Sequence, residues 1–318
     1  MSEIFKSGDK VQLTGPKGKM NTFTLEKGGR FGTHRGEIKH DEIIGKPSGS
    51  VFSLPTGEEY LALKPLLSDY VLSMPRGAQI IYPKDAGQII VEGDIFPGAV
   101  VVEAGVGSGA LSSYLLRAIG EKGKLFSFEL REEFAEIAKA NVENFLGGAP
   151  KNWKITLGAL QDQLGKTVKR GSADRAVLDM LAPWQCIDAV AEALRPGGLV
   201  IVYVATATQL SRVAEQIKDS EKFTTPAAFE TLVRPWHLEG LAVRPEHRMI
   251  SHTGFLLTAR RLADGATLPD FRKRRVNKVE GSEEDVEHWY GLSERKVGEK
   301  KLRKTLRQVT TESKKRKK

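Results

Sequence analysis

The run VVVEAGVGSGAL, residues 100–111, combines residue types that could bind a nucleotide. Apolar residues lead into Gly105, Gly107 and Gly109, which predicts a strand, a glycine-rich turn and then a helix. Glycines let a ligand approach the main chain, and a helix N-terminus exposes backbone N–H groups. The spacing G-x-G-x-G, two places after Glu103, departs from the G-x-G-x-x-G pattern of dinucleotide-binding proteins. A purely structural glycine turn is the alternative interpretation.

Glu129 ends the next apolar run, KLFSFEL, 20 residues after Gly109. A carboxylate at the tip of the second strand can accept hydrogen bonds from both hydroxyls of an adenosine ribose. NAD-dependent enzymes place an acid there too, so Glu129 indicates an adenosine cofactor without identifying it; a solvated strand end is the alternative. Phe134, in the helix expected next, could cover a face of the adenine or simply pack in the core.

Asp179 occupies the corresponding position in DRAVLDMLAPW, residues 174–184. In open α/β sheets the ligand crevice lies outside the carboxyl ends of the strands. The glycine turn, Glu129 and Asp179 are therefore expected to converge on one crevice. A helix N-cap is the structural alternative for Asp179.

The elements that must position these residues alternate between apolar strands and helical segments from about Ala78 to Asp264. AVVVEAG precedes ALSSYLLRAIG, KLFSFEL precedes EEFAEIAKANVENFL, DRAVLDM precedes CIDAVAEAL, and LVIVYVA precedes QLSRVAEQI. This alternation predicts an α/β fold with βαβ units and a mostly parallel, doubly wound sheet.

Three domains are expected. Residues 1–75 contain short alternating runs (KVQLT, TFTL, SVFSL and EYLAL) between Gly, Pro and charged turns, which predicts a small β-rich domain. Residues 76–264 are expected to form the α/β domain. Residues 265–318 lose the apolar periodicity and end in KKRKK, which favours a flexible basic extension.

Charge is concentrated at the C-terminus. Residues 270–318 hold 17 Lys and Arg against 9 Asp and Glu, so they account for +8 of the net charge of +9. The near-neutral remainder can attract phosphate only through local patches. The single cysteine, Cys186, excludes an internal disulfide and a cysteine-rich zinc site. With no signal-peptide pattern in MSEIFKSGDK and no long apolar run, we expect a cytoplasmic protein.

Several motifs taken together resemble those of the tRNA (adenine-58-N1) methyltransferase family in its bacterial form. They are YPKD (82–85), EAGVGSGAL, VLDMLAPW, LRPGGLVIVYVATATQ (194–209) and HTGFLLTARR (252–261), and the resemblance covers roughly residues 5–262. It implies a Rossmann-like class I methyltransferase domain after a small β-domain, S-adenosylmethionine as cofactor without a metal, tRNA as substrate, and a homotetramer.

The resemblance also implies roles for individual residues. Asp179, Tyr203 and Tyr82 would be catalytic, with both tyrosines beside the substrate adenine. The implied cofactor positions are Glu103, Gly105, Gly107, Ser108, Gly109, Ala110, Leu111, Glu129, Phe134, Ala159, Leu160 and Asp179. Ala159 departs from the family pattern, because many relatives have an acid there that contacts the cofactor adenine; Gln161 or Asp162 could replace it, or the backbone alone could bind.

The expected reaction needs little covalent chemistry from the protein. Adenine N1 has an in-plane lone pair that can attack a sulfonium methyl directly, so the enzyme mainly orients and polarises the base. Positive charge then spreads to the N6 amino group, where Asp179 could stabilise it or later act as base. Tyr203 and Tyr82 would fix the base, or else they are packing residues.

The base must leave its stack before N1 is accessible, and RNA contacts elsewhere must offset that cost. The segment RPWHLEGLAVRPEHRMISH, with Arg234, Arg244, Arg248 and His252, is a candidate phosphate-binding surface. A solvated hairpin with structural arginines is the alternative.

Three other functions fit parts of the pattern: a class I methyltransferase for protein or small-molecule acceptors, a nonenzymatic RNA-binding protein with a degenerate fold, and an NAD-dependent oxidoreductase. The combined motifs disfavour the first, the intact glycines and carboxylates disfavour the second, and the glycine spacing disfavours the third.

Overall fold

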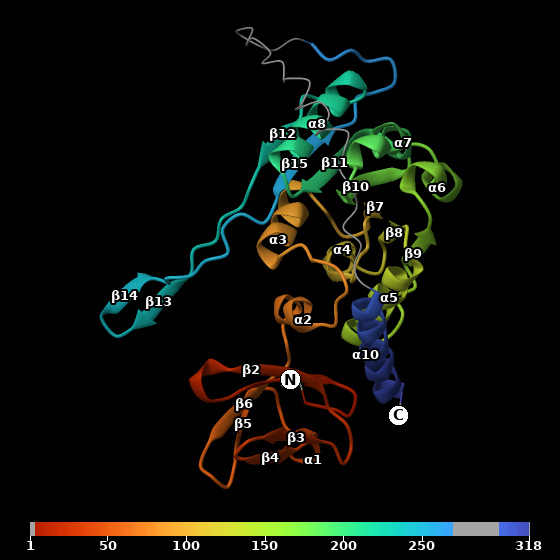
Figure 1. Cartoon of the computed structure of the whole chain (residues 1–318). Helices are drawn as coiled ribbons and strands as arrows, with labels where there is room; N and C mark the ends of the chain where they lie inside the picture. The colour runs from red at the N-terminus through yellow and green to blue at the C-terminus, as the bar shows by residue number, and fades with distance from the viewer. Residues whose placement is uncertain (1–3, 270–298, 318) are drawn as a thin grey trace. The chain divides into compact units, whose positions relative to one another are not determined.

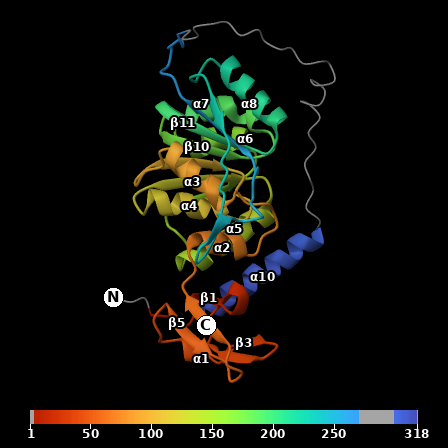
Figure 2. The same ribbon diagram turned by 90° about the vertical axis from the view of Figure 1, so that its left-hand side faces the viewer.

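The structure is a computed structural model that describes residues 4–269 and 299–317. The chain divides into two compact units (Figures 1 and 2). The first contains residues 1–78, 136–150 and 298–318, and the second contains residues 79–135 and 151–297. No helix among the described residues is long and apolar enough to cross a membrane.

The first unit is built on an antiparallel sheet with the order β2-β1-β6-β5. Its strands are β1 (Lys10–Thr14), β2 (Met20–Thr24), β5 (Ser50–Ser53) and β6 (Glu59–Leu63), with a separate β3–β4 hairpin (Arg30–Thr33 and Gly36–Lys39). Buried side chains such as Val11, Leu13 and Leu25 form its core. The expected small β-rich domain is therefore present, and short helices α1 (His40–Ile43) and α2 (Leu67–Ser73) complete its N-terminal part.

The C-terminal residues differ from the sequence-based expectation. Residues 299–317 form helix α10 (Glu299–Lys317) within the first unit, not a flexible extension, while residues 270–298 lie outside the described part. Leu302, Thr305, Leu306 and Val309 recur at helical spacing and turn inward, with Thr305 and Val309 buried. Because the helix is rich in Lys and Arg, the sequence pattern does not reveal this narrow apolar stripe.

The second unit contains a seven-stranded sheet with the order β12-β15-β11-β10-β7-β8-β9. The predicted strands appear as β7 (Val100–Ala104), β8 (Lys124–Glu129), β10 (Ala173–Asp179) and β11 (Leu194–Val204), joined by β9 (Trp153–Leu157). These five are parallel, whereas β15 (Phe255–Arg260) pairs antiparallel with β11, and β12 (Ala227–Phe229) with β15. The predicted Rossmann-like fold is confirmed.

Helices cover both faces of this sheet. The face that bears Val102 and Ala104 shares a core with α6 (Leu160–Thr167), α7 (Ile187–Ala193) and α8 (Ala207–Asp219). Side chains alternate along a strand, so Val101 and Glu103 face the other side, which contacts α4 (Ala110–Ile119). Helix α3 (Pro83–Glu92) contacts α4, and α5 (Glu132–Leu146) runs from the second unit into the first.

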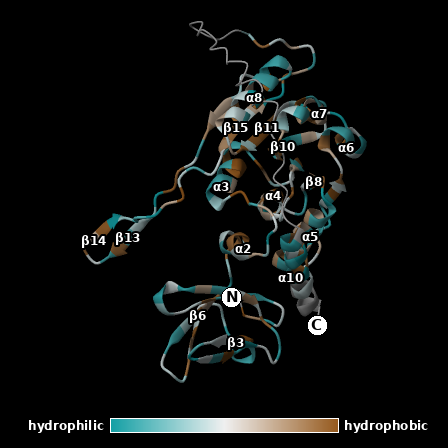
Figure 3. Cartoon of the chain, in the orientation of Figure 1, coloured by the Kyte–Doolittle hydropathy of each residue, from teal (hydrophilic) through white to brown (hydrophobic). Residues whose placement is uncertain are grey.

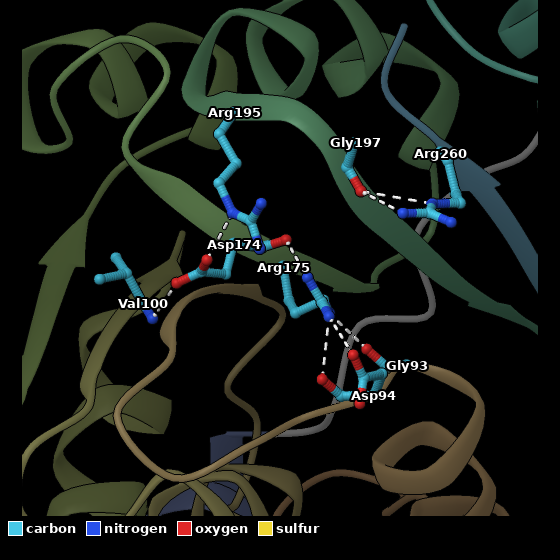
Figure 4. A network of polar contacts seen from close by, with 8 residues as sticks. All are labelled: Gly93, Asp94, Val100, Asp174, Arg175, Arg195, Gly197 and Arg260. Atoms are coloured by element: carbon cyan, nitrogen blue, oxygen red, sulfur yellow. Dashed lines mark hydrogen bonds and ion pairs between the residues drawn. The ribbon is translucent and has the colours of Figure 1, made fainter.

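Polar contacts fix the amino ends of the strands (Figure 4). Asp174 accepts a hydrogen bond from Val100 N at 2.8 Å and pairs with Arg195 at 2.6 Å. The buried Arg175 donates to Gly93 O and pairs with Asp94, both at 2.6 Å. These contacts join β7, β10, β11 and the turn after α3, and leave the opposite edge of the sheet for a binding site.

Candidate active site

The carboxyl ends of β7 and β10 are neighbours at the point where the strand order reverses. The chain proceeds from β7 to β8 and β9 on one side and then crosses to β10 and β11 on the other. Loops that leave such a switch point in opposite directions open a crevice between them. The crevice expected from sequence lies at this edge, where Ala104 is in register with Leu178, one residue before Asp179.

The glycine loop depends on backbone that only glycine adopts readily. Gly105, Gly107 and Gly109 have φ values of 86°, 54° and 80°. A Cβ on Gly105 would lie 1.7 Å from the carbonyl oxygen of Asp179, so the loop packs directly on the main chain of β10. Gly109 is the N-cap of α4, whose first residues Ala110 and Leu111 are buried, as is Ser108. The turn therefore requires glycine because its backbone has positive φ values and because a Cβ on Gly105 would clash with β10.

Glu129 is held in place by main-chain donors. Its Oε2 accepts from Gly107 N at 3.1 Å, and its Oε1 accepts from Leu130 N at 3.0 Å and Arg131 N at 3.2 Å. Only 6% of the residue is exposed. The carboxylate is thus fixed next to the glycine loop, as the sequence-based interpretation requires.

Asp179 is half-buried at the end of β10. Burial, with a smaller contribution from the charge of Glu129, raises the pKa of its carboxyl group to about 7. A carboxyl group that titrates near neutral pH at the edge of a ligand crevice is suited to stabilise charge or to exchange a proton.

Tyr203 lies beside Asp179, because the two residues are in register on adjacent parallel strands. Its hydroxyl donates to the carbonyl of Thr253 at 2.7 Å, and the ring packs against Gly254, where a Cβ would lie 2.4 Å from Tyr203 Cζ. Burial raises the pKa of Tyr203 to about 12, and neighbours that include Asp85, Asp179 and Tyr82 contribute. The phenol therefore stays neutral, which suits a positioning role and not that of a base.

Tyr82 and the two residues after Pro83 come from the start of α3. Tyr82 is the N-cap of this helix. Lys84 Nζ pairs with Asp85 at 2.8 Å and donates to Thr253 Oγ1 at 2.6 Å, while Thr253 Oγ1 donates to Asp85 at 2.6 Å. Asp85 is fully buried. This buried pair holds Thr253, whose carbonyl accepts from the Tyr203 hydroxyl. The YPKD motif by itself gives no signal for the roles of Lys84 and Asp85, because their partner Thr253 is distant in sequence.

Glu103 lies inside the protein near the end of β7. It is fully buried and accepts from Ser112 Oγ at 2.9 and 2.8 Å and from Ser127 Oγ at 2.5 Å. Burial raises the pKa of Glu103 to about 7 even though both serines lower it. These contacts support a role in joining β7, α4 and β8, not a direct cofactor contact.

The expected adenine-side residues are also mainly internal. Phe134 is fully buried, and the Arg131 guanidinium covers a face of its ring at 4.0 Å, which favours core packing. Leu160, also buried, begins α6 after the N-cap Ala159. Gln161 Oε1 accepts from Cys186 Sγ at 3.3 Å, whereas Asp162 is exposed.

The four expected RNA-binding residues do not form one cluster. Arg234, Arg244 and Arg248 are exposed on or beside the hairpin of β13 (Trp236–Glu239) and β14 (Ala242–Pro245), which leads away from β12 and β15 (Figure 1). His252 instead directly precedes Thr253, whose carbonyl accepts from the Tyr203 hydroxyl. Its Nδ1 contacts Glu230 at 2.8 Å, and this contact raises its pKa.

The edge of the sheet therefore combines a glycine loop, a fixed carboxylate, a carboxyl group that titrates near neutrality and a neutral tyrosine. Such a set can hold a nucleoside cofactor and orient a planar acceptor beside it.

Two family models and several known proteins match this chain. Residues 60–243 match the family described as "tRNA methyltransferase complex GCD14 subunit", and residues 4–52 match "TrmI-like N-terminal". The tRNA (adenine(58)-N(1))-methyltransferase TrmI of Thermus thermophilus is 31% identical over 77% of this chain and 94% of its own length. The Methanocaldococcus jannaschii enzyme named tRNA (adenine(57)-N(1)/adenine(58)-N(1))-methyltransferase TrmI is 30% identical over 73% of this chain and 88% of its own.

Two solved structures are similar over 82% of this chain. The SAM-dependent O-methyltransferase of Thermotoga maritima has a TM-score of 0.76 and 30% identity, covering 82% of this chain and 95% of its own. The tRNA (m1A58) methyltransferase TrmI of Aquifex aeolicus has a TM-score of 0.72 and 29% identity, covering 82% of this chain and 100% of its own.

Proposed function

Because this chain belongs to the GCD14/TrmI family of tRNA methyltransferases, we propose that it transfers a methyl group from S-adenosylmethionine to N1 of adenine 58 in the T-loop of tRNA. The convergence of the glycine loop, Glu129, Asp179 and Tyr203 on one edge of the sheet carries this proposal. The products would be 1-methyladenosine in tRNA and S-adenosylhomocysteine.

The crevice residues fit this cofactor. Gly105 has no side chain, and a Cβ there would meet the backbone of Asp179, so the cofactor can approach the main chain of the loop. Glu129 supplies a carboxylate that can accept hydrogen bonds from ribose hydroxyls. Gly105, Gly107, Ser108, Gly109, Ala110, Leu111 and Glu129 would hold the cofactor, with Leu160 and Ala159 at the adenine. When bound, S-adenosylmethionine supplies an electrophilic methyl group on a sulfonium.

The protein's own contribution is to orient and polarise the acceptor. The N1 lone pair would attack the methyl carbon of the bound cofactor as the bond from that carbon to sulfur breaks and S-adenosylhomocysteine leaves, so neither a metal ion nor a covalent enzyme intermediate would be needed. Asp179 accepts a hydrogen bond from the N6 amino group and stabilises the positive charge that develops on the base. It then takes the N6 proton if the product is released neutral.

The tyrosines define where the base can lie. Tyr203 is fixed through Thr253, and Tyr82 precedes the helix that carries Lys84 and Asp85. A base held between them presents its Watson–Crick edge to Asp179. Arg234, Arg244, Arg248 and His252 would contact RNA and offset the cost of unstacking adenine 58.

The exposed β13–β14 hairpin supports assembly of several copies of this chain. Leu238 is 74% exposed, and Val243, its partner across the strands, is 57% exposed. Trp236 and Leu241 add to this apolar surface, part of which is brown in Figure 3. Apolar patches of this kind mark interfaces, so we include a homotetramer in the proposal, in a protein that acts on cytoplasmic tRNA.

The reaction is tested by incubating the full chain with unmodified tRNA transcript and labelled S-adenosylmethionine, followed by mass spectrometry of the nucleosides. Labelled 1-methyladenosine is the expected product. Cofactor binding without transfer to tRNA would refute the tRNA assignment and leave the alternative, a methyltransferase for protein or small-molecule acceptors; one similar structure is titled an O-methyltransferase.

A further inference from the structure

Helix α10 has one face buried in the first unit and an opposite face that is cationic. Thr305 Oγ1 lies 3.0 Å from Lys301 O of the same helix and 3.3 Å from Arg76 O, Val309 is 1% exposed, and the helix contacts β2. Lys300, Arg303, Lys304 and Arg307 recur at i, i+3, i+4 and i+7, on the side opposite to Thr305 and Val309, and all four are exposed.

The charge on this face is of one sign. Residues 300–311 contain five Lys and Arg, including Lys301, and no Asp or Glu, and the sequence continues to KKRKK at 314–318. In Figure 3 most of α10 is coloured as hydrophilic. The matches to the two families end at residue 243, so this surface is a feature of the chain beyond them.

We propose that the cationic face of α10 binds the phosphate backbone of the tRNA substrate. This proposal rests on the proposed function, because that function supplies a polyanion as substrate. Helical spacing of four cations along about 10 Å presents several positive charges to successive phosphates. Anchoring of the helix through Thr305 and Val309 lowers the ordering cost that a free basic tail would incur.

A membrane surface fits this face less well. Basic helices that bind bilayers insert an apolar face between the lipids. The apolar stripe of α10 is narrow and is already buried within its own unit, as the exposure of Val309 shows. The available face offers charge alone, which matches RNA.

The test compares two variants of the full chain with equal loss of charge. The first is Lys300→Gln, Lys304→Gln and Arg307→Gln on α10. The control is Lys122→Gln, Lys166→Gln and Lys169→Gln, three exposed lysines of the second unit. Binding of tRNA transcript is measured across salt concentrations without the methyl donor, and methyl transfer is measured over tRNA concentrations from below KM to saturation. Circular dichroism melting checks that both variants fold.

We expect the α10 variant to bind tRNA about tenfold or more weakly at low salt, with a slope of log K against log salt reduced by roughly 2 to 3. KM for tRNA should rise with kcat unchanged, while the control stays near wild type. Equal effects in both variants, or none in either, would overturn the proposal, as would lost binding to phosphatidylserine vesicles with unchanged tRNA binding. Failure of the proposed function gives a different result, because the wild-type protein itself would then transfer no methyl group to tRNA.

Discussion

Asp179 shows how local environment sets the chemistry of a single side chain. Its backbone carbonyl packs against Gly105, and its neighbour in register is Tyr203. Burial raises its pKa, and the charge of Glu129 raises it further. Because the pKa is raised from 3.8 to about 7, the ionised form that stabilises a cationic base predominates only above neutrality.

The activity should follow this ionisation. We expect kcat/KM to fall as pH drops below about 7, because protonated Asp179 no longer stabilises the charge on the base. Asp179→Asn should lower kcat by about 10²–10³-fold and remove this limb of the pH profile. Asp219→Asn, at an exposed carboxylate that ends α8, is the control. A wild-type profile in the Asp179 variant would contradict the assignment.

The buried pair of Lys84 and Asp85 should act through Tyr203. Replacing Asp85 with Asn removes the carboxylate that receives Thr253 and Lys84, so the carbonyl that fixes the Tyr203 hydroxyl is released. We expect kcat to fall about tenfold or more while S-adenosylhomocysteine affinity is retained. Tyr203→Phe should then add little to Asp85→Asn.

The control for this cycle is Glu92→Gln, at an exposed carboxylate on the same helix. Additive losses in the double variant would show that the pair does not act through the tyrosine.

At the scale of elements, Glu103 joins strands and a helix that position the glycine loop. Ser112 from α4 and Ser127 from β8 donate to its carboxyl group, and Trp153 from β9 donates to Ser127. Because the folded-state pKa is about 7, above the ordinary 4.5, its contribution to stability is complete below pH 4.5 and is lost as pH rises through 7.

Glu103→Gln should therefore reduce the loss of stability between pH 4.5 and pH 7. The amide cannot ionise, so it avoids a cost on the order of 1–3 kcal/mol at pH 8. Thermal melting at several pH values, with the exposed Glu121→Gln as control, measures this. A variant that loses as much stability as wild type over this range would contradict the stated cause.

Gly105→Ala tests the packing of the loop on β10. A Cβ 1.7 Å from the Asp179 carbonyl forces the main chain apart, in addition to the strain at a φ of 86°. We expect a loss of roughly 3 kcal/mol or more in unfolding free energy by urea titration, together with loss of S-adenosylhomocysteine binding.

Gly87→Ala is the matched control, since nothing lies within 4 Å of its Cβ position in α3. A gain of about 0.5–1 kcal/mol is expected there. Similar effects at both glycines would mean that contact with β10 does not constrain the loop.

At the scale of the whole molecule, the β13–β14 hairpin should carry assembly. Leu238→Asp with Val243→Asp places charge on its most apolar surface, so light scattering should show a mass below that of four copies. Glu239→Gln on the same hairpin should leave the mass unchanged. An unaltered mass in the first variant would remove the hairpin from the interface.

Sequence reasoning predicted the sheet because strand and helix periodicities alternate, and it placed Glu129 and Asp179 because strand ends share an edge. The position of Glu103 at the cofactor stays a prediction, and alternation along β7 turns its side chain toward α4. Contacts between distant segments, such as Asp85 with Thr253, leave no spacing signal. Helix α10 was missed because its buried stripe is narrow among many cations.

The position of methyl transfer on tRNA can be tested directly. Two tRNA transcripts that differ only at position 58, adenine in one and guanine in the other, would be treated with the enzyme and S-adenosylmethionine, then copied by reverse transcriptase. The proposal predicts an arrest at position 58 in the first transcript and none in the second. An equal arrest elsewhere in both, or no arrest with active cofactor binding, would contradict it.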